Sequence, residues 1–307
     1  MDWNSSYIQE LIAAALREDV GAGDVTVAAT IPEHARGQAH IVAKQDLICA
    51  GLPLAEKVFR SLDPAMKIEP RVADGQLMRK GQDLLRLDGK ACAILTGERT
   101  ALNFLGRLSG IATLTHQFVE QTAGTQARIR DTRKTTPGLR LLEKYAVKMG
   151  GGTNHRLGLF DGILLKENHI ALAGGIKPAL DQAHSYASAR IKPDAMSAYA
   201  AADAAPSEAD GTSLFIQVEV RNESELREAL AAGAEAVLLD NMTPEEGRHC
   251  INVARSIRPG CVVEISGGIT LANVRAYAET GADYLSSGAL THSASNPDLS
   301  LLVDSLE

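Results

Sequence analysis

Cations, carboxylates and glycines follow six short apolar runs in the part of the sequence after about residue 125. In chain order they are residues 131–134 (DTRK), Lys166, Glu219, Asp240, residues 266–268 (SGG) and residues 287–288 (SG). Polar and glycine residues end strands for conformational reasons alone, so no single one of them identifies a site. The order of cations, carboxylates and then glycines favours a binding site, because the carboxyl ends of parallel strands meet at one edge of an α/β fold.

The cations concentrate in one segment of an otherwise acidic chain. Residues 128–166 hold nine Lys and Arg against three acids, a local charge of +6, whereas the rest of the chain carries −13. Lys144 and Lys148 stand four residues apart on an expected helix, and we interpret them as a solvated helix face. The cations that we expect at the site itself are Arg133, Lys134, Arg156 and Lys166. Cations around one pocket repel one another, so they predict a ligand with several carboxylates or phosphates.

Glycines at the last two strand ends predict a phosphate site. Gly267, Gly268 and Gly288 each lie between an apolar run and the next expected helix. Backbone N–H groups and the helix dipole attract phosphate at such turns, and phosphate sites after the last two strands recur in α/β barrels. The GxGxxG motif with an acidic partner is absent from the sequence, so we do not expect a dinucleotide-binding fold.

Two carboxylates and two histidines complete the candidate site. Glu219 and Asp240 end consecutive strands, and we interpret them as ligands of Mg²⁺ or of sugar hydroxyls. The alternatives are a pair of ion-paired strand-end acids or a glycosidase acid–base pair. His155 and His292 are candidate anion contacts. Lys166 also admits the Schiff-base chemistry of a barrel aldolase, with activation by neighbouring cations.

Strand–helix alternation after residue 125 predicts the framework of the site. Six apolar runs separated by helical stretches indicate parallel strands joined by crossover helices, in a closed or nearly closed barrel or in a doubly wound open sheet. Upstream we expect an amphipathic helix over 7–18, a small α+β domain over roughly 26–90 and a long helix over 91–122. The stretch 190–212 is rich in Ala, Asp and Pro, fits neither period, and is interpreted as a surface insertion.

Composition limits the classes of protein that this chain represents. Its 307 residues, 45% of them hydrophobic, exceed a typical single domain and predict two domains. The net charge of −7 argues against binding to nucleic acid or to an anionic membrane, and no apolar run is long enough to span a bilayer. The polar N-terminus resembles no signal peptide and the four cysteines are widely spaced, so we expect a cytoplasmic protein with reduced thiols.

Longer motifs resemble those of the quinolinate phosphoribosyltransferases. The matching segments are GERTALNFLGRLSGIAT (97–113), DTRKTTPGLRLLEKYAVKMGGGTNHRLGLFDGILLKENHI (131–170), VEV (218–220), LLDNM (238–242), EISGGI (264–269) and SSGALTHS (286–293). The resemblance covers nearly the whole chain in order, and the DTRKT, NHR and KENH block is its most specific part. It implies an α/β protein in which an N-terminal α+β sandwich-like domain (1–113) precedes an incomplete parallel α/β barrel (114–290). A C-terminal tail (291–307) would pack back on the first domain.

The resemblance also implies an activity and its residues. The reaction joins quinolinate and phosphoribosyl pyrophosphate, with Mg²⁺, to give nicotinate mononucleotide, pyrophosphate and CO₂. Quinolinate binding is assigned to Thr132, Arg133, Lys134, His155, Arg156 and Lys166, and to Arg99 lent by the neighbouring subunit of a homodimer, which admits assembly into hexamers. Phosphoribosyl pyrophosphate binding is assigned to Lys134, Glu219, Asp240, Ser266, Gly267, Gly268, Gly288, Ala289 and His292. The catalytic residues are Lys134, Lys166, Glu219 and Asp240, the last two holding Mg²⁺ through the diphosphate or water.

Three other functions are compatible with the same strand-end residues. One is that of a paralogue with this fold and a different acceptor, such as those associated with molybdenum transport. Another is a Schiff-base aldolase that uses Lys166. The third is a phosphosugar-binding scaffold without turnover. The intact DTRK and NHR motifs and Arg99 favour quinolinate, because a smaller or monoanionic acceptor needs fewer cations.

Overall fold

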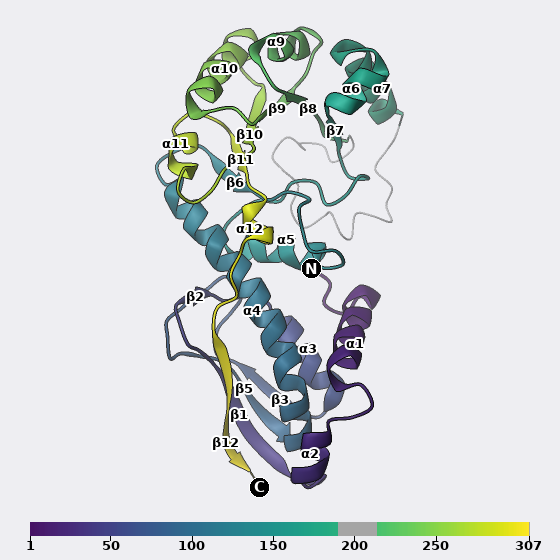
Figure 1. Ribbon diagram of the computed structural model, residues 1–307, viewed down its shortest axis with the longest axis vertical. Coiled ribbons are helices and arrows are strands. Elements are labelled where there is room, and N and C mark those ends of the chain that lie inside the picture. The colour runs from purple at the N-terminus through teal and green to yellow at the C-terminus, as the bar shows by residue number, and fades with distance from the viewer. Residues whose placement is uncertain (190–213, 307) are drawn as a thin grey trace. The chain divides into compact units, whose positions relative to one another are not determined.

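The computed structural model describes residues 1–189 and 214–306 and divides the chain into two compact units (Figure 1). The first unit comprises Met1–Leu114, Lys148–Gly151 and Ala294–Glu307, and the second comprises Thr115–Val147 and Gly152–Ser293. The insertion expected over 190–212 lies outside the described residues. Within the described ranges, no helix is both long enough and apolar enough to cross a membrane.

The first unit is built on an antiparallel sheet (Figure 1). Its helices are α1 (Ser6–Val20), α2 (Val25–Thr30), α3 (Leu52–Leu62) and the first part of α4 (Ala91–Gln121). Its strands are β1 (Arg36–Ala43), β2 (Leu47–Ile48), β3 (Lys67–Pro70), β4 (Leu77–Met78), β5 (Asp83–Lys90) and β12 (Leu299–Leu306). Four of them form a sheet in the order β12-β1-β5-β3, and β2 pairs with β4. Helices α1 and α4 confirm the two helices expected in this half of the chain.

Side-chain periodicity decides which faces of this unit are buried. In α3, Leu54, Ala55, Val58 and Phe59 recur at helical spacing and are all fully buried. In β1, buried and exposed residues alternate at first, as expected of a strand with one face against the core. The small α+β domain expected from the sequence is therefore a sheet with helices packed against its apolar face.

The C-terminal segment returns to the first unit. Strand β12 pairs antiparallel with β1, so that Leu301 lies opposite Ile41. Just before this strand, the chain passes α4 so closely that a Cβ on Gly110 would lie 2.3 Å from the carbonyl oxygen of Ser295. Only glycine fits at position 110, although glycine is a poor helix former.

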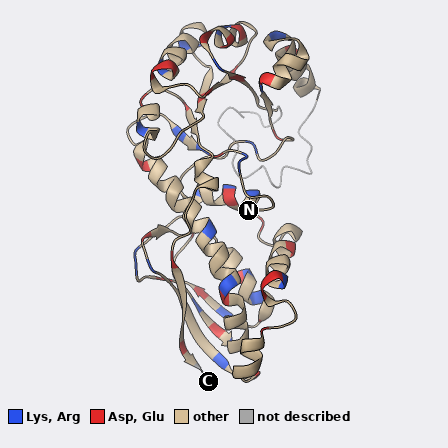
Figure 2. Cartoon of the chain, in the orientation of Figure 1, with Lys and Arg blue, Asp and Glu red and all other residues tan. Residues whose placement is uncertain are grey.

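The second unit alternates strands with helices. Its elements are β6 (Arg128–Arg130), α5 (Arg140–Met149), β7 (Ile163–Leu165), α6 (Glu167–Ala173), α7 (Ile176–Ser188), β8 (Ile216–Val220), α9 (Glu223–Ala231), β9 (Ala236–Asp240), α10 (Pro244–Ile257), β10 (Val262–Ser266), α11 (Val274–Ala278), β11 (Tyr284–Ser286) and α12 (Ala289–His292). Basic and acidic residues are interspersed along the outer helices such as α9 and α10 (Figure 2). The exterior of these helices therefore carries both signs of charge.

The strand order of the second unit is that of an incomplete barrel. The parallel sheet runs β6-β11-β10-β9-β8-β7, so each strand from β7 to β11 lies beside its neighbour in the chain. Strand β6 then pairs with β11, the last of the series. A doubly wound sheet would instead reverse its order at an internal strand. Among the described residues β6 and β7 do not pair, which leaves the ring open at one seam. The predicted fold class is confirmed.

Candidate active site

Parallel pairing brings the predicted strand-end residues to one edge of the sheet. Ser266 pairs with Asp240 on one side and with Ser286 on the other. Glu219 pairs with Leu238, two residues before Asp240. The carboxylates and the glycine-containing turns that follow these strands therefore lie next to one another around the mouth of the open barrel.

Lys134 lies across Gly288, beside His292. A Cβ on Gly288 would be 2.8 Å from Cδ of Lys134 and 3.1 Å from Nε2 of His292. The hydroxyl of Thr291 donates to the Lys134 carbonyl at 2.8 Å, and the Lys134 N–H donates to Oγ1 of Thr132 at 3.0 Å. The loop after the first barrel strand is thus fastened to the turn after the last one, and a cation and a glycine meet there.

Asn241 orients Asp240 and fills the space beside Gly267. Its amide Nδ2 donates to Oδ2 of Asp240 at 2.8 Å, and its N–H donates to the Ser266 carbonyl at 2.8 Å. Asn241 has a φ of 57°, which asparagine tolerates better than most residues. Gly267 has a φ of 102°, and a Cβ there would lie 2.2 Å from Oδ1 of Asn241. The turn after β10 therefore requires glycine for both conformation and space.

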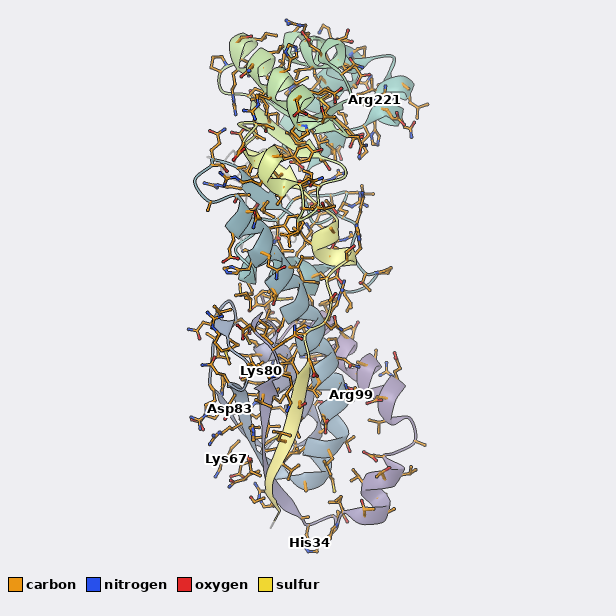
Figure 3. All side chains as sticks on the ribbon, turned by 60° about the vertical axis from the view of Figure 1, so that its left-hand side comes forward. His34, Lys67, Lys80, Asp83, Arg99 and Arg221 are labelled. Carbon is orange, nitrogen blue, oxygen red and sulfur yellow. The ribbon has the colours of Figure 1, made fainter. Side chains whose placement is uncertain are left out.

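Lys166 and Glu219 form an ion pair at the ends of adjacent strands. The Lys166 side chain is 47% exposed and that of Glu219 is 11% exposed, so the pair borders solvent. Arg221 (Figure 3) pairs with Glu167 at 2.6 Å and with Glu225 at 2.9 Å. A Schiff-base lysine needs an amine that is free of such a partner, so this arrangement disfavours the aldolase alternative.

Two arginines predicted to bind the acceptor lie close enough to repel each other. Burial lowers the pKa of Arg156, and the neighbouring charge of Arg133 lowers it further. Arg140 joins the loops that carry them, because its guanidinium donates to Oγ1 of Thr135 at 2.9 Å and to the Leu157 carbonyl at 3.2 Å. Two cations held this close together repel each other, and a bound dicarboxylate would neutralise both charges.

Asp131 and Lys144 form a buried ion pair that holds the backbone of His155. Nζ of Lys144 donates to Oδ1 of Asp131 at 2.5 Å and to the His155 carbonyl at 2.8 Å. The N–H of His155 donates to the same Asp131 oxygen at 2.7 Å. Burial raises the pKa of Asp131 to about 6 and lowers the pKa of Lys144, because removal from water disfavours each charged form.

The interpretation of Lys144 as part of a solvated helix face is therefore wrong. Lys144 is 2% exposed, whereas Lys148 on the next turn of the same helix is partly exposed. The spacing of the two lysines is the same for a buried and a solvated face. What decides the burial of Lys144 is the carboxylate of Asp131, which the fold brings from the preceding strand end.

The His155 ring points into the interior of the barrel. Its side chain is 9% exposed, and Nε2 lies 3.2 Å from Oε1 of Gln217 and 3.7 Å from Oε1 of Glu264. Nδ1 accepts the N–H of Arg156 at 2.7 Å. Burial lowers the pKa of His155, and the charge of Glu264 offsets only part of that effect. Sequence reasoning identified His155 but neither of these two partners.

Glu264 accepts hydrogen bonds from three polar groups one layer beneath the strand ends. It is fully buried and accepts from Arg130 at 2.9 Å, from Nε2 of Gln217 at 3.1 Å and from the hydroxyl of Ser286. Burial acts to raise the pKa of Glu264, but the charges of His155 and Arg130 and the hydrogen bonds outweigh it, so the pKa lies below its ordinary value. The signal in the sequence is parity: Glu264 precedes Ser266 by two residues and faces the same side of the strand.

The remaining predicted residues lie as follows. Gly268 has a φ of 64° and is exposed, and Ala289 begins α12. Arg99 belongs to the first unit, on α4, and its side chain is exposed (Figure 3). The structure thus gathers the barrel residues of the predicted site around one mouth, whereas Arg99 lies in the other unit.

The fold and this mouth define a class of protein. Cations, a carboxylate pair and glycine turns surround the carboxyl ends of an incomplete parallel barrel. Such an arrangement binds ligands that carry phosphate and carboxylate groups, and its charged side chains can stabilise charge that develops during group transfer. The class is that of the phosphate-binding α/β-barrel enzymes.

Comparisons with known proteins agree in family. The family model for the C-terminal domain of quinolinate phosphoribosyl transferase matches residues 111–214 and 193–302, and the model for the N-terminal domain matches residues 24–109. A probable nicotinate-nucleotide pyrophosphorylase (carboxylating) of Bacillus subtilis is 40% identical over 298 residues, covering 97% of this chain and 94% of that protein. A quinolinate phosphoribosyltransferase (decarboxylating) of Nicotiana tabacum is 39% identical over 310 residues, covering 97% of this chain and 82% of that protein.

Solved structures show the same similarity. The nicotinate-nucleotide pyrophosphorylase of Francisella tularensis superposes with a TM-score of 0.85 at 36% identity, covering 97% of this chain and 96% of that chain. NadC of Streptococcus pyogenes superposes with a TM-score of 0.84 at 36% identity, covering 100% and 99%. The chain belongs to the quinolinate phosphoribosyltransferase family, the phosphoribosyltransferases of NAD biosynthesis.

Proposed function

We propose that this chain transfers the phosphoribosyl group of phosphoribosyl pyrophosphate to quinolinate and decarboxylates the product at the mouth of its barrel. The products are nicotinate mononucleotide, pyrophosphate and CO₂. The observation that carries the proposal is the meeting of cations, carboxylates and glycine turns at one mouth: Ser266 pairs with Asp240 and Ser286, Lys134 lies against Gly288, and Lys166 pairs with Glu219. Two adjacent cations match the two carboxylates of quinolinate.

In this proposal the acceptor lies against the cations of the first two strand ends. Arg133 and Arg156 bind its carboxylates, and Thr132, Lys134 and Lys166 complete the pocket. His155 contributes from below, since its ring is buried and its Nδ1 is occupied by the Arg156 N–H. Quinolinate is thereby oriented with its ring nitrogen toward the carboxylate side of the mouth, where the ribose is bound.

Phosphoribosyl pyrophosphate occupies the other half of the mouth. Glu219 and Asp240 bind the ribose hydroxyls, and Lys134 bridges the two substrates. The 5′-phosphate is held by the turn residues Ser266, Gly267, Gly268, Gly288 and Ala289, with His292 beside them. Positive φ values at Gly267 and Gly268 support this role, because such turns expose backbone N–H groups to an anion.

The chemistry requires positioning and electrostatic stabilisation. The bond between the anomeric carbon and pyrophosphate breaks, positive charge develops on the ribose, and the carboxylates of Glu219 and Asp240 stabilise it. The quinolinate nitrogen forms the new bond to that carbon and becomes a pyridinium. The adjacent carboxylate then leaves as CO₂, its bonding electrons pass to the ring carbon, which the cationic nitrogen stabilises, and a proton takes its place.

Glu219 and Asp240 fit Mg²⁺ as indirect ligands. Among the described residues no group of three or more His, Cys, Asp or Glu could hold a metal ion by itself. Mg²⁺ commonly keeps several waters and binds substrate phosphates, so this carboxylate pair could hold it through water or through the diphosphate. The ion would neutralise charge on the departing pyrophosphate.

We further propose a homodimer in which Arg99 of one subunit completes the quinolinate pocket of the other, with hexamers as a larger assembly. The exposed side chain of Arg99 supports this, because a cation on the surface of the first unit is available to a second copy. A location in the cytoplasm also stays a prediction, which cell fractionation tests.

Pyrophosphate release by the purified protein tests the proposed function. Quinolinate and nicotinate are offered separately as acceptors with phosphoribosyl pyrophosphate and Mg²⁺. Release with quinolinate alone is the expected result. Release with nicotinate instead, or tight binding of phosphoribosyl pyrophosphate without release, would favour the paralogue or the scaffold. Borohydride trapping of Lys166 with a carbonyl substrate would reveal the aldolase.

A further inference from the structure

A directed chain of hydrogen bonds runs beneath the strand ends to the backbone of Arg156. Glu264 accepts from Arg130 at 2.9 Å and from Nε2 of Gln217 at 3.1 Å. Oε1 of Gln217 lies 3.2 Å from Nε2 of His155, and Nδ1 of His155 accepts the Arg156 N–H at 2.7 Å. The chain connects a buried charge pair with the peptide that carries a predicted quinolinate-binding cation.

The direction of each bond in this chain is fixed by its neighbours. Nε2 of Gln217 faces two acceptors, the Glu264 carboxylate and the Val237 carbonyl at 3.4 Å, so its amide oxygen must face His155. Nδ1 of His155 accepts a backbone N–H, so the neutral ring carries its proton on Nε2 and donates it to Gln217. One tautomer of His155 satisfies both contacts.

This series of hydrogen bonds is protected from water and lies one layer below the proposed substrate site. Gln217 and Glu264 are both fully buried. Because side chains on a strand alternate with period two, Gln217 lies below Glu219, and Glu264 lies below Ser266. Neither side chain is therefore placed to touch a ligand at the mouth, and each acts on the site through another residue.

We propose that Gln217 is a positioning residue of the quinolinate site, which holds His155 in the Nε2–H tautomer and thereby fixes the backbone of Arg156. This inference rests on the proposed function and adds a residue to it. Arg156 is further held by its own bond to the Gly162 carbonyl at 2.8 Å, so Gln217 controls the peptide while Gly162 controls the guanidinium. Loss of Gln217 should therefore affect quinolinate more than phosphoribosyl pyrophosphate.

One substitution at Gln217 and one control separate this role from general packing. Gln217→Met keeps the length of the side chain and removes the acceptor for His155. Gln182→Met makes the same change at an exposed position of α7 in the same unit. For Gln217→Met we expect KM for quinolinate to rise about five- to tenfold, the effect of one lost hydrogen bond, with kcat and KM for phosphoribosyl pyrophosphate within about twofold. Gln182→Met should keep all three constants within about twofold of the wild type.

Imidazole ¹⁵N NMR of the wild-type protein gives a readout that is independent of activity. We expect His155 to show the neutral Nε2–H pattern, and Gln217→Met to show mixed tautomers. An Nδ1–H ring in the wild type would overturn the inference even if Gln217→Met failed to fold. An unchanged quinolinate KM in a folded Gln217→Met protein would do the same while leaving the proposed function intact. If the wild type releases no pyrophosphate with quinolinate, the proposed function itself fails, and the inference fails with it.

Discussion

The side chain of Lys134 passes so close to Gly288 that a Cβ at position 288 would lie 2.8 Å from Cδ of the lysine. The two residues follow the first and last strands of the barrel series, which are not neighbours in sequence but pair in the sheet through β6 and β11. In the proposed site this contact places a cation over the turn that binds phosphate.

Gly288→Ala tests whether the contact between Lys134 and Gly288 contributes to activity. The added methyl displaces the side chains of Lys134 and His292, which are flexible or exposed, so we expect the fold to be kept. We expect kcat/KM for phosphoribosyl pyrophosphate to fall roughly tenfold or more, because one charge-assisted contact is lost. Gly260→Ala is the matched control, because a Cβ there meets nothing within 4 Å and its φ is not positive. Equal activity of both variants would contradict the role of the contact.

Arg133→Ala should weaken quinolinate binding selectively. The substitution removes one of the two adjacent cations proposed to bind the dicarboxylate. We therefore expect quinolinate binding to weaken by about 2–5 kcal/mol, seen as a higher KM for quinolinate, while KM for phosphoribosyl pyrophosphate changes little. Arg128→Ala, at the exposed start of the same strand β6, serves as the control. Steady-state kinetics with each substrate varied in turn measures the difference. Wild-type quinolinate affinity in Arg133→Ala would remove this residue from the pocket.

Lys144→Met should destabilise the protein strongly. It leaves the Asp131 carboxylate buried without its cation, which typically costs about 3–5 kcal/mol of the free energy of unfolding. Lys177→Met breaks the exposed Lys177–Asp181 pair and should cost about 0.5 kcal/mol or less. Urea denaturation of both variants measures the two costs. Similar values would show that the buried pair contributes no more than a surface one.

The lowered pKa of His155 predicts a pH dependence of stability. The folded state binds the His155 proton less tightly than the unfolded chain, so between the folded pKa and about 6.5 the unfolded state carries more protons and stability rises with pH. The stability contributed by the neutral His155 ring is fully present above about pH 6.5 and is lost as the pH falls. The free energy of unfolding changes by at most about 1.4 kcal/mol per pH unit in that range. His155→Gln should flatten the curve below about pH 6.5. Parallel curves for the two proteins would contradict the assignment.

Mixing two inactive variants tests the proposed shared site. Arg99→Ala and Arg156→Ala damage the two halves of one pocket, so random exchange of subunits should restore about a quarter of the wild-type sites in a two-fold dimer. Activity of the mixture after subunit exchange is the measurement, with each variant mixed with itself as control. A mixture as inactive as its parents, despite heterodimers detected by native mass spectrometry, would mean that Arg99 serves no neighbouring subunit.

The strand-end half of the site was predictable because it depends on local pattern. Apolar runs of about five residues predict the strands, and in a parallel barrel the residue after each run must face the mouth. Lys166 follows β7 directly, Asp240 is the last residue of β9, and Glu219 is the next to last residue of β8. The long helix α4 was equally predictable, since leucines at helical spacing continue over its length.

The buried layer beneath the mouth was not predicted, because it depends on contacts between distant segments. The polar side chain of Glu264 within a short apolar strand is stabilised by Arg130 and Gln217, 134 and 47 residues away in sequence. The prediction that Lys144 is solvent-exposed was wrong for a similar reason. Helical spacing shows which residues share a face of the helix, but not which other segment covers that face. Strand parity could have revealed Glu264, but no local pattern names its partners.

The central claim is that one site performs both phosphoribosyl transfer and decarboxylation. The most direct measurement is mass spectrometry of the nucleotide formed from quinolinate and phosphoribosyl pyrophosphate, together with the ratio of CO₂ to pyrophosphate released. The account predicts nicotinate mononucleotide and equal amounts of CO₂ and pyrophosphate. A nucleotide that keeps both carboxylates, or pyrophosphate release without CO₂, would contradict it.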